Sequence, residues 1–372
     1  MNAIYLHIPF CVKRCDYCSF YSIEYNHRDI VNYCKALKKE IQIQAKLFQN
    51  KIIDTIYFGG GTPSVMETSQ VDSIFESLNR YFNISAACEI TFELNPKTVD
   101  KEYLQMLRKV GINRLSIGIQ SLNNKELELL GRIHDSQKAI KALEDAREAN
   151  FDNISVDIIT AIPGQSKKDI RKSLEIITDY SPEHISIYDL SIDKGTKISE
   201  LVNSKTLKAN DNDKELYYFA IDFLAKAGFE HYEISSFAKK GFQSKHNNKY
   251  WERNSYIGLG ASAHSMIADV RFNNPADMQK YLYKLDKNEL PSENIEFLTY
   301  KDIISEFIML GLRKTDGIDI GSIPKTTKYG KQLLGNIQEL IRMGYLTQNN
   351  KKVAISHSHL FISNEIIIHI IP

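Results

Sequence analysis

Three of the five cysteines in this 372-residue chain lie close together, at Cys11, Cys15 and Cys18. Thiolate sulfur binds soft metal centres, and three cysteines on one loop can hold one face of an iron–sulfur cluster. A [4Fe–4S] cube held in this way keeps its fourth iron open to a substrate or a cofactor. Zinc is the alternative metal, but it prefers four ligands, usually in two short pairs, and the sequence contains no second pair. The spacing therefore favours an iron–sulfur cluster.

A run of three glycines is the second candidate binding element. Gly59, Gly60 and Gly61 are followed by Thr62 and Pro63. Adjacent glycines let the backbone approach a ligand closely, and the proline stiffens the exit from the loop. A phosphate-binding loop would end in lysine and then serine or threonine, which this run lacks. The run therefore predicts a loop that binds a ligand through its backbone.

Polar residues in apolar strand patterns indicate a shared cavity. Glu93 ends one predicted strand, Gln120 ends the next, and Asp157 lies within the one after that. Each could be a satisfied structural residue, because an acid or amide is costly to bury without a partner. Three in the same layer are better explained by a cavity. Arg132 could pair with one of these carboxylates or with a carboxylate of the ligand.

Alternating strand and helix patterns position these residues. Short runs of β-branched and aromatic residues end in turn signals, and helical spacing fills the stretches between them. The predicted strands are 4–8, 55–58, 89–93, 114–119, 155–159 and 184–190, and the predicted helices are 30–48, 69–81, 101–110, 125–130, 136–149 and 168–180. Six such pairs predict parallel strands in a barrel or an open doubly wound sheet, with ligands at the carboxyl ends of the strands.

The pattern changes after residue 190. We expect a loop over 194–212, a helix over 214–227, a short strand over 231–237 and an irregular stretch over 241–264. From about residue 299, two helices (302–312 and 332–343) and a strand (352–356) predict a winged-helix-like C-terminal domain.

Composition narrows the function classes. Lysine and arginine number 47 against 46 aspartates and glutamates, and this balance disfavours nucleic acid as the main ligand. No apolar run approaches the roughly 20 residues that span a bilayer, and the first residues do not read as a signal peptide. We expect a cytoplasmic protein without a disulfide framework, in which Cys34 and Cys88 are small buried side chains.

The run YLHIPFC at residues 5–11, continued to Cys18, resembles the cluster loop of the radical S-adenosylmethionine superfamily. The resemblance implies that Cys11, Cys15 and Cys18 ligate a [4Fe–4S] cluster, and that the glycine run meets the amino group of S-adenosylmethionine. Tyr17 would lie near this cofactor or shield the cluster. The resemblance also implies direct contacts with S-adenosylmethionine for Tyr5, Gly60, Gly61, Thr62, Glu93, Gln120, Arg132 and Asp157.

Two related families share these motifs. In the oxygen-independent coproporphyrinogen III oxidases a fourth cysteine stands where this chain has Phe20, and an N-terminal extension precedes the first strand. The run HNNKYW at residues 246–251 instead matches the HNxxYW signature of the HemW family of haem chaperones. Histidine is a common axial ligand of haem iron, and tyrosine and tryptophan can stack on a macrocycle. The residues leave open whether His246 binds the iron or bonds within a packed loop, and His264 shares this ambiguity.

The resemblance to the HemW family covers essentially the whole chain. It implies an α/β fold with a partial (β/α)6 radical S-adenosylmethionine barrel over 1–235, a connecting segment with the HNxxYW motif over 236–298, and a HemN-type, helical, winged-helix-like domain over 299–372. It also implies a protein of porphyrin metabolism that binds a [4Fe–4S] cluster, S-adenosylmethionine and haem. Haem would pass to haem-dependent proteins such as respiratory enzymes. The resemblance is also compatible with a homodimer.

Two other functions compete with this expectation. The runner-up is oxidative decarboxylation of coproporphyrinogen III to protoporphyrinogen IX, which the missing fourth cysteine disfavours. The third is DNA binding through the lysines of the C-terminal domain, with the cluster as a sensor. The near-neutral net charge argues against that function.

Overall fold

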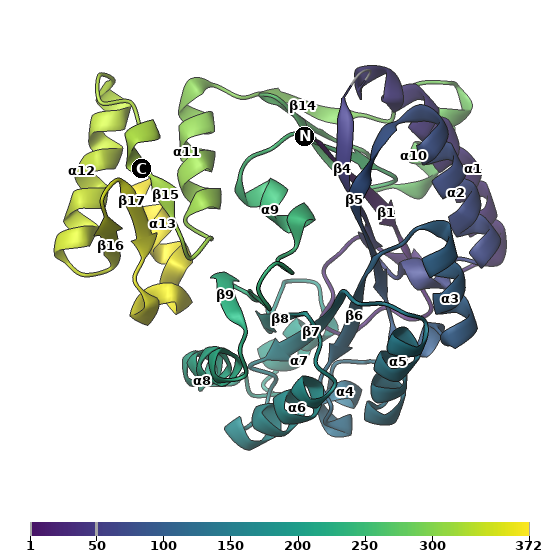
Figure 1. Ribbon diagram of the computed structural model, residues 1–372, viewed down its shortest axis with the longest axis horizontal. Helices are drawn as coiled ribbons and strands as arrows, with labels where there is room; N and C mark the ends of the chain where they lie inside the picture. Colours follow the sequence, from purple (N-terminus) through teal and green to yellow (C-terminus); the bar gives the residue numbers. More distant parts are fainter. Residues whose placement is uncertain (1, 49–50, 372) are drawn as a thin grey trace.

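One curved sheet forms the framework of the fold. In the computed structural model, which describes residues 2–48 and 51–371, twelve strands run in the order β14-β13-β12-β11-β1-β4-β5-β6-β7-β8-β10-β9. Figure 1 shows helices packed on the outside of this sheet. The arrangement confirms the partial (β/α)6 barrel. Its six parallel strands are β1 (Asn2–Ile8), β4 (Ile52–Gly60), β5 (Asn83–Leu94), β6 (Arg114–Gln120), β7 (Ile154–Thr160) and β8 (His184–Asp189).

The alternation of side chains along the strands separates the core from the barrel interior. In β1, Ile4, Leu6 and Ile8 are fully buried in the apolar core, which the outer helices share. Tyr5 and His7 alternate with them and therefore face the inside of the barrel. The helices between the parallel strands are α1 (His27–Gln44), α2 (Thr68–Tyr81), α3 (Lys101–Val110), α4 (Asn124–Leu129), α5 (Ser136–Glu148) and α6 (Lys167–Asp179).

Two segments after β8 differ from the sequence-based expectation. The predicted loop 194–212 contains α7 (Lys197–Asn203), which begins after a capping Thr196 and buries Ile198. This helix is two turns long, too short to show a helical period. The predicted strand 231–237 is instead a hairpin of β9 (Glu230–Glu233) and β10 (Ser236–Ala238). The helix expected over 214–227 is confirmed as α8 (Asp213–Lys226).

The stretch expected to be irregular, 241–264, is regular over half of its length. It holds α9 (Lys245–Trp251), β11 (Tyr256–Leu259) and the first residue of β12 (His264–Ile267). β11 pairs in parallel with β1, and β12, β13 (Val270–Asn273) and β14 (Glu293–Phe297) continue the sheet antiparallel, with α10 (Met278–Asp286) before β14. Strands of four or five residues are fixed by their partners more than by their own pattern.

The C-terminal domain has the two expected helices, and its expected strand is one arm of a hairpin. Its three-stranded sheet has the order β15-β17-β16. A last helix, which the sequence pattern does not predict, buries Ile366, Ile367 and Ile370. The elements are α11 (Tyr300–Gly311), β15 (Ile318–Asp319), α12 (Lys328–Arg342), β16 (Leu346–Asn349), β17 (Lys352–Ile355) and α13 (Ser363–Ile370). Among the helices of the described residues, none is long and apolar enough to span a bilayer.

The C-terminal domain joins the two edges of the large sheet. α11 follows edge strand β14 closely in the chain, and Figure 1 shows α9 between this helix and the barrel. Beyond α11, the carbonyl of Arg313 accepts a hydrogen bond from the amide of Ile234 at 3.0 Å. The amide of Thr315 donates to the carbonyl of Tyr232 at 3.1 Å. Because Tyr232 belongs to β9 at the opposite edge, the domain spans the open side of the barrel.

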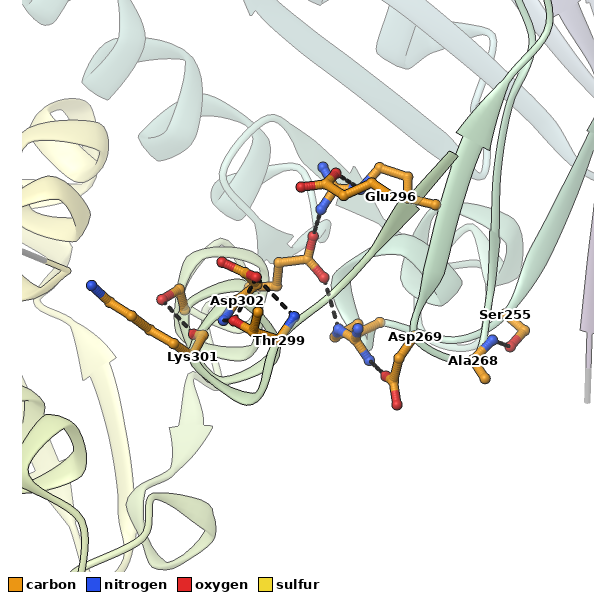
Figure 2. Close-up of polar contacts among 11 residues, drawn as sticks. Ser255, Ala268, Asp269, Glu296, Thr299, Lys301 and Asp302 are labelled. Carbon is orange, nitrogen blue, oxygen red and sulfur yellow. Dashed lines mark hydrogen bonds and ion pairs between the residues drawn. The ribbon is translucent and has the colours of Figure 1, made fainter. Parts of the chain in front are cut away.

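A group of charges fixes α11 to the sheet. The Glu306 carboxylate on α11 accepts hydrogen bonds from Arg253 Nε at 2.8 Å and from Arg271 of β13. Arg253 also pairs with Asp269, at 3.0 Å from Nη1 to Oδ1 (Figure 2). The side chain of Glu306 is only 11% exposed, so two guanidinium groups compensate one buried carboxylate. Breaking this group should therefore loosen the domain contact.

We predict that Glu306→Ala lowers the free energy of unfolding by about 2–3 kcal/mol, because it leaves two arginines without their shared partner. Urea denaturation of the full chain measures this loss. Glu296→Ala is the matched control, since the Glu296 carboxylate is 56% exposed and lies 3.8 Å from Arg271. We expect it to change stability by less than about 1 kcal/mol. Equal losses in the two variants would contradict the assignment.

Candidate functional site

A cavity of about 450 Å³ lies at the carboxyl ends of the parallel strands. The loop after β1, the glycine run after β4 and the ends of β5 to β8 all contribute to its wall. Eleven of the residues singled out in the sequence meet there: Cys11, Cys15, Tyr17, Cys18, Gly60, Gly61, Thr62, Glu93, Gln120, Arg132 and Asp157. Tyr5 and His246 are not part of the wall.

Backbone contacts fold the cysteine loop, residues 9–25, over the end of β1. The short strand β2 (Phe10–Cys11) pairs in parallel with β3 (Ile23–Glu24), and the amide of Tyr25 donates to the carbonyl of Cys11 at 2.8 Å. Asp16 anchors the middle of the loop, because its amide donates to the carbonyl of Leu130 at 3.0 Å. The loop is therefore held at both ends and at its centre.

Two polar groups approach the thiols. Arg132 Nη1 lies 3.3 Å from Cys15 Sγ, and Thr62 Oγ1 lies 3.5 Å from Cys11 Sγ. Donors at these positions stabilise thiolate sulfur, the form that binds a metal. Burial raises the pKa of the Cys11 and Cys18 thiols and so disfavours the thiolates, which a cationic centre in the cavity would stabilise. This donor set fits an iron–sulfur cluster held by the three cysteines.

The cysteine positions do not fit a single metal ion. Within 2–48 and 51–371, no three His, Cys, Asp or Glu side chains converge closely enough to hold one ion. In a [4Fe–4S] cube, by contrast, each thiolate would bind a different iron, so the sulfurs need only face the same space. All three cysteines line the same cavity, as that arrangement requires.

The glycine run lies directly against the cysteine loop. The amide of Gly61 donates to the carbonyl of Ile8, and the amide of Thr62 donates to the carbonyl of Phe10, both at 2.8 Å. A Cβ on Gly61 would lie 2.8 Å from the Phe10 carbonyl oxygen and 3.0 Å from Cys11 Sγ. Gly60 has a φ of +110°, which side chains rarely adopt. Glycine is thus required where the two loops touch.

The two acids face the cavity as expected. Glu93 Oε1 accepts a hydrogen bond from Tyr57 Oη at 2.7 Å, and Asp157 Oδ2 accepts one from Ser116 Oγ at 3.0 Å. Burial raises the pKa of Glu93 to about 7 and raises that of Asp157 as well. Both carboxylates would therefore gain from a cationic ligand.

Gln120 and Arg132 complete this side of the cavity. Gln120 has a φ of +69°, a backbone conformation that is uncommon for residues other than glycine. Where it occurs, it is often found at ligand sites. Arg132 Nη2 donates to the carbonyl of Gly118 at 2.6 Å, and its other hydrogen bonds go to Cys15 and Tyr17 rather than to a carboxylate. Its pairing with a ligand carboxylate stays a prediction.

Several residues of the wall belong to no motif. Tyr57, Asn95, Ser116 and Tyr188 also line the cavity. The alternation of side chains along β4 could have predicted Tyr57. This residue lies two positions before Gly59, so both face the same side of the sheet. Tyr17 lines the cavity too, and it packs against an apolar cluster that includes Leu130. Its position is compatible with both roles expected for it.

Tyr5 lies inside the barrel, behind the cavity wall. Its Oη is 3.1 Å from His7 Nδ1, and its ring stacks on that of Tyr57 with centroids 6.2 Å apart. Tyr5 can therefore reach a ligand in the cavity only through Tyr57 or after a local shift. Its contact with S-adenosylmethionine stays a prediction.

His246 lies on α9, toward the amino ends of the strands. Its ring bonds at both nitrogens, with Nδ1 at 3.0 Å from Thr55 Oγ1 and Nε2 at 2.9 Å from Tyr250 Oη. The residue is 1% exposed, and burial lowers its pKa to about 3, so the ring is neutral. A haem iron could take His246 only if one of these bonds broke. The role as axial ligand stays a prediction.

Comparison with known proteins covers the whole chain. Residues 5–177 match the Radical SAM superfamily, and residues 298–358 match the HemN C-terminal domain. The chain is 31% identical to the heme chaperone HemW of Lactococcus lactis, over 98% of this chain and 96% of that protein. It is 32% identical to the heme chaperone HemW of Bacillus subtilis, over 98% of each. Coproporphyrinogen III oxidase (HemN) from Escherichia coli has a similar fold, with a TM-score of 0.89 at 22% identity, covering 100% of this chain and 90% of that one.

We predict that alanine at Cys11, Cys15 or Cys18 abolishes cluster formation after anaerobic reconstitution with iron and sulfide, because each removes one thiolate. Bound iron and sulfide per chain, with the visible absorbance of the cluster, measure the effect. Cys34→Ala and Cys88→Ala are matched controls, since both thiols are buried away from the cavity wall. Full iron content in any variant of the first three would contradict the assignment.

Proposed function

Because the chain belongs to the HemW family of radical S-adenosylmethionine proteins, we propose that it is a haem chaperone, which binds haem and passes it to haem-dependent proteins. A [4Fe–4S] cluster and S-adenosylmethionine would occupy the cavity. The observation that carries this proposal is that three cysteines, a glycine run and two acids line one cavity, in a chain of which 98% matches heme chaperones.

The residues of the cavity suit this cofactor pair. Cys11, Cys15 and Cys18 would hold the cluster, and backbone carbonyls of the glycine run would accept hydrogen bonds from the ammonium of S-adenosylmethionine. Glu93 and Asp157 would balance the positive charge of the cofactor. A bound, reduced cluster would supply one electron for cleavage of S-adenosylmethionine to methionine and a 5′-deoxyadenosyl radical; the residues of the cavity would orient the cofactor and limit access of water.

The alternative function is that of a coproporphyrinogen III oxidase. Its support is the similarity in fold to coproporphyrinogen III oxidase (HemN) from Escherichia coli. At 22% sequence identity, this similarity supports the fold alone. Phe20, which stands where those oxidases have their fourth cysteine, is 68% exposed at the cavity wall. This chain therefore lacks the thiol that those oxidases carry at this position, so we favour the chaperone. We further propose a cytoplasmic location, respiratory enzymes among the acceptors, and a homodimer.

Haem titration and turnover on one sample separate the two functions. We expect the anaerobically reconstituted protein to bind haem stoichiometrically, seen in its Soret band. We expect no protoporphyrinogen IX from coproporphyrinogen III in the presence of S-adenosylmethionine and a reductant. Turnover without haem binding would overturn the proposal in favour of the oxidase. His246→Gln should alter the Soret spectrum if His246 is the axial ligand, whereas the spectrum should persist in His264→Gln.

The affinity for S-adenosylmethionine should depend on pH near neutrality. Burial raises the pKa of Glu93 to about 7, so its carboxylate loses its charge as the pH falls through that value. We therefore predict that the Kd rises about fivefold between pH 7 and pH 6, because only the ionised form attracts the cation. Equilibrium dialysis of the reconstituted protein measures this. Glu93→Gln should flatten the profile, and an unchanged profile in that variant would contradict the assignment to Glu93.

A further inference from the structure

The outermost strand β14 leaves one edge of the large sheet uncovered. It pairs with β13 on one side, and no strand of residues 2–48 and 51–371 joins it on the other. The opposite edge differs, because Lys314 of the C-terminal domain forms a bridge with Glu233 of β9. An uncovered edge offers backbone donors and acceptors to a further strand. β14 is therefore the more open of the two edges.

Hydrogen bonding with β13 shows which backbone groups of β14 point outward. The amide of Leu298 donates to the carbonyl of Asp269, just before β13, at 2.8 Å. The register shift of β14 lies before Glu296, so the pairing is regular from Glu296 onward. Because backbone groups alternate in an antiparallel pair, Glu296 and Leu298 face β13. The amide and carbonyl of Phe297 and the carbonyl of Ile295 therefore point away from the sheet.

The side chains of these two outward residues are also apolar and exposed. Ile295 is 60% exposed and Phe297 is 77% exposed. Phe297 lies opposite Val270, and Val270 lies opposite Ile267, so an apolar row crosses β12, β13 and β14 and ends at the edge. Edge strands are commonly protected by charged side chains, proline or a covering element. Two large apolar side chains at such an edge indicate a surface that another strand covers.

The edge is complementary to itself. When a second copy of β14 runs antiparallel about a two-fold axis through Glu296, Phe297 of each copy lies opposite Ile295 of the other. The amide of each Phe297 then donates to the carbonyl of Ile295 in the second copy, and the four apolar side chains lie together on one face. An axis through Ile295 would instead place Phe297 opposite Glu293. The pattern of β14 therefore matches a second copy in one register.

One charge opposes this pairing. The two Glu296 carboxylates would lie on either side of the axis, and like charges directly opposite each other destabilise a strand pair. Arg271 Nε lies 3.8 Å from Glu296 Oε2, so each carboxylate brings a cation with it. The contact covers a single short strand, and small contact areas are typical of weak interfaces. The dimer should therefore be weak and should depend on protein concentration.

We propose that β14 is the interface of a homodimer, in which two copies extend the large sheet antiparallel across its uncovered edge. This inference rests on the homodimer of the proposed function and gives it a surface and a register. It requires neither haem nor the cluster, because the residues at the contact belong to β14 and its neighbour β13.

The first test measures the dimer by sedimentation of the full chain over a range of concentrations. Ile295→Lys and Phe297→Lys should each raise the Kd of the dimer about tenfold, because a charge replaces an apolar side chain at the contact. Ile368→Lys is the matched control, since Ile368 on α13 is also exposed, at 72%, and lies outside β14. A monomer at every concentration, or a dimer that the two β14 variants leave unchanged, overturns the proposal.

The second test decides the register. Glu296→Gln should lower the Kd of the dimer about threefold, because it removes the like charges at the axis. Glu296→Cys should form a disulfide between copies on mild oxidation, since facing residues at such an axis lie about 4.5 Å apart between Cα atoms. Asn294→Cys should not, because its two copies lie about 13 Å apart along the strands. The unchanged chain gives the background of its own five cysteines.

Equal cross-linking of Glu296→Cys and Asn294→Cys, or none in either, overturns the register. Haem titration of Phe297→Lys keeps the two proposals apart. A variant that loses the dimer and still binds haem supports the interface, whereas an unchanged chain that dimerises through β14 without binding haem refutes the haem chaperone and leaves the interface standing.

Discussion

The contact between the cysteine loop and the glycine run is the constraint on which the site depends. Gly61 lies so close to the Phe10 carbonyl and to Cys11 Sγ that no side chain fits between them. The two loops belong to adjacent parallel strands, so this contact fixes the height of the thiols above the ends of the strands. Every other group of the cavity is then placed by the register of β5 to β8. A shift of one strand would separate the acids from the thiols.

The barrel interior is unusually polar for the centre of a fold. Arg114 is 2% exposed and lies near both Glu93 and Asp157, whose pKa values it lowers. Burial is the larger effect, and the pKa of each acid remains raised. The same desolvation keeps His184 and His246 neutral. The interior therefore gains most from a ligand that brings positive charge to the acids.

The sequence predicts the barrel strands, the cysteine loop and the acids well, because each depends on local spacing or alternation. It fails where pairing partners decide the structure. The strands of 230–238 and 256–267 are too short to carry a period. Besides its cap and buried Ile198, α7 is held by contacts of Lys197 and Ile198 with the distant Asp16. Tyr57 belongs to no motif, yet it joins two of them. The hydrogen bonds of His246 to Thr55 and Tyr250 arise from contacts between distant segments, which no local pattern can reveal.

The span from β14 through α11 to the β9–β10 hairpin also bears on how the chain acquires its shape during synthesis. Residues 313–315 bond to residues 231–234 only after most of the chain has left the ribosome. Until then β9, at one edge of the sheet, presents unpaired backbone groups, which other strands can capture. Closure of so distant a contact is slow relative to local folding. The nascent barrel thus passes through a period in which this contact has not yet formed and its open side has not yet been spanned.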